Sequence, residues 1–140
     1  MIANIREYIN KSVRLIDSDL KPAKFALIGN TADTKIENTF EVIFGSLSSE
    51  REEYTINSVI PLTVSIYKNG FKDETENFDK NYCKAIDIQS VTMDQALFRD
   101  HGGILDVESS GIEVETVLSN DNLFKYTIQF NIRVNYKYEL

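Results

Sequence analysis

The chain has 140 residues, of which 42% are hydrophobic, and a net charge of −7. This length suits a single domain, residues 1–140, with a core of its own. An acidic protein repels phosphate backbones, so the charge argues against direct nucleic-acid recognition. No segment approaches the roughly 18 consecutive apolar residues of a membrane span, and Met1 to Glu7 do not have the pattern of a secretion signal.

Residues 2–20 are predicted to form a helix. Apolar residues recur at steps of three or four, and these are Ile2, Ile5, Ile9, Val13, Ile16 and Leu20. Lys21 precedes Pro22 and therefore avoids the helical conformation, which ends the helix. Residues 23–35 are compatible with either a short strand at 25–28 or a loop.

Two strands, residues 36–47 and 54–67, are predicted to form an antiparallel hairpin. Each has an apolar face, made by Phe40, Val42 and Phe44 in the first and by Tyr54, Ile56, Ile60, Leu62, Val64 and Ile66 in the second. Pro61 cannot donate a ladder hydrogen bond, which predicts that the second strand is at an edge or is bulged there. The polar residues 48–53 are expected to connect the strands.

Helical spacing returns after the turn signal at Asn69 and Gly70. The segment 71–89 is predicted to be a helix, with its face made by Phe71, Thr75, Phe78, Tyr82, Ala85, Ile86 and Gln89. Residues 93–98 are expected to add a further helical turn.

The last two strands, residues 104–118 and 124–138, are predicted to pair as a hairpin. In the second, every even residue is apolar or aromatic, namely Phe124, Tyr126, Ile128, Phe130, Ile132, Val134, Tyr136 and Tyr138. Fully extended, this strand would reach about 50 Å, whereas a compact domain of this size measures roughly 37 Å across. It must bend or project, and a projecting apolar face would need cover from another chain. We expect a bulge at 109–111 and the turn at 120–122.

The order of these elements is α-β-β-α-β-β. Strands grouped in hairpins predict an α+β fold, with a mainly antiparallel sheet of about four strands and helices on one face.

The side chains that carry chemistry are sparse. His101 is the only histidine and Cys83 the only cysteine, and neither lies in a nucleophile motif. His101 is interpreted as a solvated loop residue and Cys83 as a small buried hydrophobe. One Cys and one His cannot complete a structural zinc site. We therefore expect no catalytic residue, no cofactor and no metal, and hence no enzyme.

The order of elements resembles a known family. The stripe from Ile2 to Leu20, the strand Val59 to Tyr67 and the terminal strand Phe124 to Tyr138 carry the likeness. In these features the chain resembles the small tail terminator and tail-completion proteins of long-tailed bacteriophages and related contractile particles. The resemblance covers nearly the whole chain as a pattern and includes no diagnostic motif.

This resemblance implies a structural protein of a virion or phage-tail-like particle, assembled in the bacterial host cytoplasm. Such proteins form a ring, usually of six copies, that caps the tail tube. The implied partners are further copies of the chain, the tail tube protein and a head connector or neck protein. The family has no catalytic residues.

Two loops are candidate assembly contacts. The first is the strand connection with Glu50, Arg51, Glu52 and Glu53, and the second is the loop with Arg99 and His101. A charge run such as the first is also typical of a merely solvated loop. The alternative function is a small-ligand or peptide-binding α+β module without catalysis, whose pocket would lie between sheet and helices.

Overall fold

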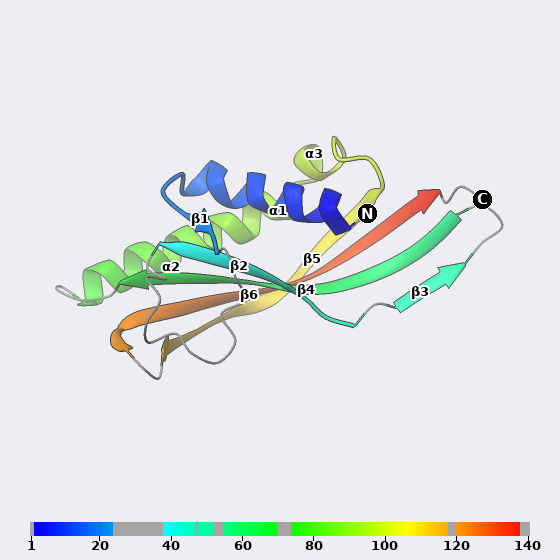
Figure 1. The fold of residues 1–140 in the computed structure, drawn as a ribbon. Helices are drawn as coiled ribbons and strands as arrows, with labels where there is room; N and C mark the ends of the chain where they lie inside the picture. Colours follow the sequence, from blue (N-terminus) through cyan, green and yellow to red (C-terminus); the bar gives the residue numbers. More distant parts are fainter. Residues whose placement is uncertain are drawn as a thin grey trace.

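The computed structural model describes residues 2–23, 38–46, 48–51, 55–69, 74–117 and 120–137 (Figure 1). The elements in chain order are α1 (Ile2–Ile16), β1 (Lys21–Pro22), β2 (Thr39–Phe44), β3 (Ser48–Arg51), β4 (Thr55–Asn69), α2 (Glu74–Thr92), α3 (Gln95–Phe98), β5 (Ile104–Val117) and β6 (Asn120–Lys137). The α+β prediction is confirmed.

The strands form one sheet of six, in the order β1-β2-β4-β6-β5, with β3 paired to β4 beside this path. Only β1 and β2 run parallel, and the other pairs are antiparallel. The predicted number of about four strands is too low. The short β1 and β3 have no alternation of their own and exist because a neighbouring strand offers a free edge.

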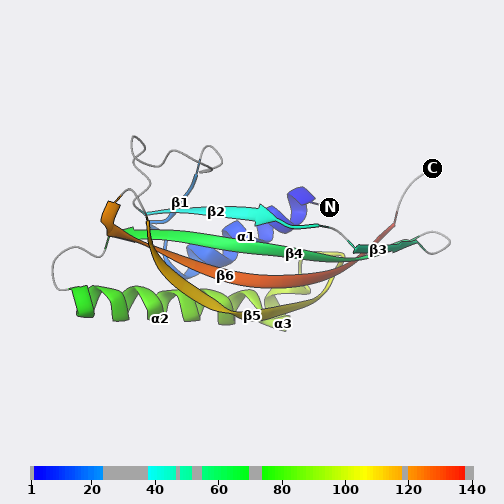
Figure 2. The ribbon, with the colours of Figure 1, turned by 90° about the horizontal axis from the view of Figure 1, so that it is seen from below.

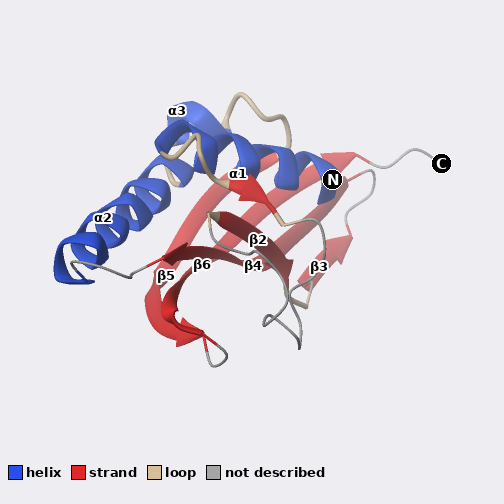
Figure 3. Ribbon diagram, turned by 60° about the vertical axis from the view of Figure 1, so that its left-hand side comes forward, coloured by secondary structure: helices blue, strands red, loops and turns tan. Residues whose placement is uncertain are grey.

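The helices lie on one face of this twisted sheet, as predicted (Figure 3). The even residues of β6 point to that face and make the centre of the core. Tyr126, Ile128, Phe130, Ile132 and Val134 are each 2% exposed or less. Period-2 alternation therefore identified the buried face of this strand correctly.

This burial corrects one expectation. Up to Val134 the apolar face of β6 is covered within the chain itself, so it needs no second chain. Cover comes from Ile5, Ile9 and Val13 of α1 and from Ala85 and Ile88 of α2, all members of the same core cluster. The side chains at 136 and 138 lie outside the described residues.

Pro61 lies opposite an interruption in the ladder. Phe44 of β2 pairs with Leu62, whereas Ser48 of β3 pairs with Val59. Between these two pairs the chain from β2 to β3 has three residues, whereas β4 has two. This difference of one residue is the offset of a bulge. The Pro61 carbonyl accepts from the Gly45 amide at 2.7 Å, so the missing N–H also points to this interruption. β4 is a central strand, and the predicted irregularity is on its β2–β3 side.

Several element bounds differ from prediction. α1 ends at Ile16, before Leu20, because the Asp17 carboxylate accepts from the Asp19 amide at 3.2 Å in a local turn. Residues 120–122 belong to β6, with Val117 pairing to Asn120, so the predicted turn position is wrong. On α2, Ile86 of the predicted face is exposed, whereas Ile88, which was not assigned to that face, is buried.

Candidate assembly surface

Beyond the helices the sheet continues as a narrow extension, which we call the arm. It consists of β3 with residues 55–59 of β4 and 133–137 of β6, and it projects past the helical layer (Figures 1 and 2). The length of β4 and β6, 15 and 18 residues, produces this projection. The sequence-based expectation that the long strand bends or projects is therefore confirmed.

The arm brings the two predicted contact loops to one end of the molecule. Glu50 of β3 pairs with Asn57, which pairs with Asn135 of β6. The backbone N–H of Asn135 then donates to the backbone carbonyl of Gly103 at 2.8 Å. The side-chain amide of Asn135 also forms a hydrogen bond with the side chain of Asn57. One row across the sheet thus connects the strand that carries Glu50 to the loop that contains Arg99 and His101.

The predicted contact residues have different settings within this end. Glu50 and Arg51 lie on β3, so the expectation of an irregular connection is wrong for 48–51. Glu52 and Glu53 lie outside the described residues. Arg99 is exposed and follows α3 directly.

His101 and Cys83 do not have the settings expected of them. His101 is half-buried: its ring meets the edge of Tyr8 with centroids 5.1 Å apart, and its Nδ1 lies 3.5 Å from Asn4 Oδ1. Cys83 is exposed on α2, so the interpretation as a buried hydrophobe is wrong. The imidazole of His101 is partly buried because α1 packs over its loop and brings Asn4 and Tyr8 beside the ring.

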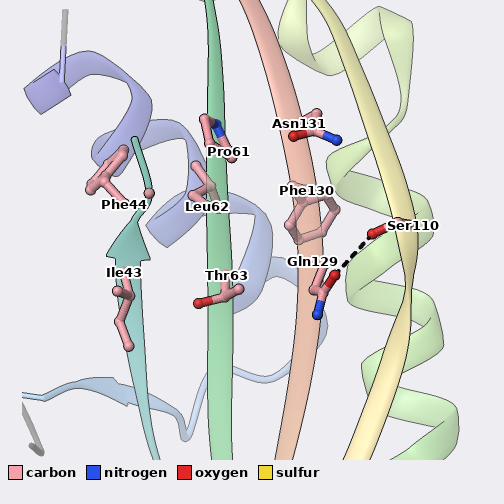
Figure 4. A pocket seen from close by; sticks show the side chains of 10 residues that line it. Ile43, Phe44, Pro61, Leu62, Thr63, Ser110, Gln129, Phe130 and Asn131 are labelled. Atoms are coloured by element: carbon pink, nitrogen blue, oxygen red, sulfur yellow. Dashed lines mark hydrogen bonds between the residues drawn. The ribbon is translucent and has the colours of Figure 1, made fainter. Parts of the chain in front are cut away.

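The face of the sheet opposite the helices has an open hollow of about 220 Å³. We call this side the open sheet face. Ile43, Pro61, Thr63, Gln129 and Asn131 line the hollow, and the helices lie behind the strands in this view (Figure 4). Ser110 of β5 donates to Gln129 Oε1 at 3.1 Å at the rim. A polar floor with apolar flanks suits contact with another surface better than enclosure of a ligand.

Acidic residues of β5 share this open face. The register places Asp106, Glu108, Glu113 and Glu115 opposite the outward residues Arg133, Asn131, Thr127 and Lys125 of β6. The register shift at 109/111 lies between the even-numbered and the odd-numbered acids and keeps all four on the same side. Simple alternation would place them on opposite faces, which is why sequence reasoning missed this column. The predicted bulge at 109–111 is confirmed.

A buried ion cluster ties the helices to the sheet. Lys68 Nζ of β4 lies 2.6 Å from Asp17 Oδ2 and 3.1 Å from Asn38 Oδ1, and Lys84 of α2 lies 3.4 Å from Asp17. Burial alone raises the pKa of Asp17, but the hydrogen bond and charge of Lys68, with Lys84 and the Asp19 amide, outweigh it, so this pKa is lowered. Sequence reasoning missed this cluster. Its one signal is that Lys68 has an even number in β4, where the even-numbered residues from Ile60 to Ile66 are apolar and face the core.

Comparisons with known proteins add little. No protein-family model matches the chain. No curated protein matches it either. Among solved structures, a chain of the virion of the native gene transfer agent (GTA) particle aligns over 91% of this chain and 92% of its own length, with a TM-score of 0.48 and 9% sequence identity. At that level of similarity the alignment assigns no function.

Two further observations concern the part of the chain that the structure describes. It contains no helix that is both long and apolar enough to cross a membrane. Its His, Cys, Asp and Glu side chains also form no group of three or more with the geometry to hold a metal ion.

Proposed function

We propose that this protein is a structural, non-catalytic component of a bacteriophage or phage-tail-like particle. It forms a ring of six copies, the number usual in the family it resembles, that caps the tail tube and joins it to a head connector or neck protein. Its location is the virion or particle, after assembly in the bacterial host cytoplasm. The observation that supports this most is the arm, because it extends beyond the chain's own helical layer.

The arm has the features of an assembly element. Among the described residues, β3 pairs only with β4, and β5 at the opposite edge pairs only with β6. An exposed edge strand presents unpaired N–H and C=O groups to another chain. These edges leave the arm available to the tail tube or neck protein. Contact between two different surfaces of successive copies is heterologous, and such contacts close into rings when the rotation between copies permits.

The alternative, a binding module, has weaker support. It requires a pocket between sheet and helices, and that space is occupied by the core cluster around Phe40, Ile60 and Ile128. The hollow lies on the other side of the sheet and is open to solvent. A small ligand there would keep much of its surface in water, whereas good ligand sites bury most of it.

The test combines native mass with imaging. Light scattering on the purified protein, alone and with tail tube protein, should give a multiple of the 16.0 kDa chain, with six copies expected, and negative-stain images should show rings. The variant Arg51→Ala with Glu52→Ala should reduce assembly and leave the circular dichroism spectrum unchanged. A monomer under both conditions would refute the ring.

The particle itself provides the second readout. Host cells that make particles without this protein should accumulate heads and tails that do not join. Complementation with the wild-type chain should restore joined particles, and a Cys83→Ser variant, which removes an exposed thiol on α2, should do so equally because the function needs no catalysis. Normal particles in the absence of the protein would contradict the proposal.

A further inference from the structure

The molecule has two exposed surfaces on opposite sides of its layers. One is the outer side of α1, away from the sheet, and the other is the open sheet face (Figure 3). Because the helices cover one face of the sheet only, a partner that contacts one of these surfaces cannot also cover the other. The two surfaces differ in charge and in shape, and each leaves apolar side chains in solvent.

The outer side of α1 presents two basic residues and one apolar residue, and Glu7 lies one turn before them. Lys11 and Leu15 are one turn apart and share a side of the helix, with Arg14 beside them, and all three are exposed. Leu15 is 58% exposed, more than any other large hydrophobic residue among those described as exposed. Leu97 and His101 border the same shallow depression as Lys11 and Leu15. We call the group Lys11, Arg14 and Leu15 the α1 ridge.

The open sheet face has the complementary properties. Ile43 and Val59 are 42% and 41% exposed, although strand alternation assigns their positions to the polar face. Ile43 lines the hollow, and Asn131 on the far wall of the hollow pairs with the exposed Glu108. The acidic column of β5 follows that edge. The hollow has apolar flanks at Ile43 and Pro61, and the acidic column lies beyond its far wall. This arrangement matches an apolar side chain flanked by ammonium and guanidinium groups.

We infer that the open sheet face receives the α1 ridge of a second copy of this chain. Leu15 of one copy enters the hollow beside Ile43 of the next. Lys11 and Arg14 face Glu108 and Glu113 of β5, which lie opposite Asn131 and Thr127, whereas Glu115 already lies 3.7 Å from Lys125. The inference rests on the proposed function, since it names the contact between neighbouring copies in the ring. The contact joins two different surfaces, so it is heterologous and each copy can bind one neighbour on either side.

A heterologous contact has a signature that a symmetric one lacks. Leu15→Glu disables the ridge and leaves the open sheet face intact, while Ile43→Glu does the reverse. Each variant alone should self-associate at least about 100-fold more weakly than the wild type, because a charge would be buried against an apolar or acidic surface. Mixed in equal amounts, the two variants each supply one intact surface, so they should form a heterodimer and nothing larger.

The measurement is sedimentation velocity of each variant and of the mixture. Both substitutions are at well-exposed side chains, so thermal melts should match the wild type and separate loss of association from loss of folding. Ile86→Glu is the matched control, since Ile86 is 39% exposed on α2 and belongs to neither surface. It should assemble as the wild type does.

Each result decides the matter. Undiminished assembly of Leu15→Glu or Ile43→Glu, no heterodimer in the mixture, or a wild-type chain that stays monomeric would overturn the inference. Failure of the proposed function is distinguishable from this. Copies that assemble through these surfaces but are absent from particles would refute the function alone, and presence in particles with both variants still forming rings would refute the contact alone.

Discussion

Replacement of Asp17 by asparagine is expected to destabilise the fold strongly. The side chain of Asp17 is 3% exposed, and the side chain of its partner Lys68 is 10% exposed. The distance between Asp17 Oδ2 and Lys68 Nζ is 2.6 Å. The substitution keeps the size and removes the charge. Lys68 is then left buried, with the Asn38 amide oxygen at 3.1 Å as the other acceptor within its reach.

The expected magnitude follows from this geometry. Removal of one partner of a buried ion pair costs about 3–5 kcal/mol, and the remaining Asn38 contact places the cost near the lower end, about 3 kcal/mol. In a domain of this size that lowers Tm by roughly 12 °C. Chemical denaturation at pH 7 measures it, with Asp19→Asn, an exposed neighbour, as the control.

The pH dependence provides an independent check. The pKa of Asp17 is lowered in the folded state, so its stabilisation is present above the ordinary carboxyl pKa of about 4 and is lost as pH falls through the folded value. Asp17→Asn should therefore lose less stability on acidification than the wild type. A free energy of unfolding within about 0.5 kcal/mol of wild type at pH 7 would show that the pair is not buried as described.

Three further tests address the core, a turn and two tyrosines. Phe130→Asp should abolish the folded circular dichroism signal, because the side chain is 2% exposed and an unpaired buried charge is costly; a retained signal would contradict its burial. Gly103→Ala should cost about 2 kcal/mol in denaturation, since Gly103 has φ +94° and an added Cβ would lie 3.1 Å from a β6 carbonyl oxygen, whereas Gly102→Ala, with nothing within 4 Å, should be tolerated. Burial raises the pKa of Tyr67 and of Tyr126 to about 12, so stability present below pH 10 should decline as pH rises toward 12. Replacement of both by Phe should flatten that decline, and an unchanged alkaline profile would argue against these shifts.

Local patterns in the sequence determined the principal elements and their buried faces. The stripe from Ile2 to Ile16 and the alternation along β4 and β6 report which side of each backbone avoids water, and this depends only on helical or strand periodicity. The same reasoning located the irregularities at Pro61 and at 109–111, since these residue types restrict the backbone wherever they occur. Cover of β6 by the chain's own helices could not be read in this way, because strand length does not reveal what packs on it.

Tertiary structure alone decided the contacts between distant segments. β1 and β3 form only because β2 and β4 offer edges to them, and Lys68 is buried at a position that alternation predicts to be apolar because α1 places Asp17 opposite it. The row from Glu50 to Gly103 and the acidic column of β5 depend on register, which bulges shift by single residues. Periodicity within one segment determines a face, whereas a site requires the register between segments, and that is set only when the sheet has formed.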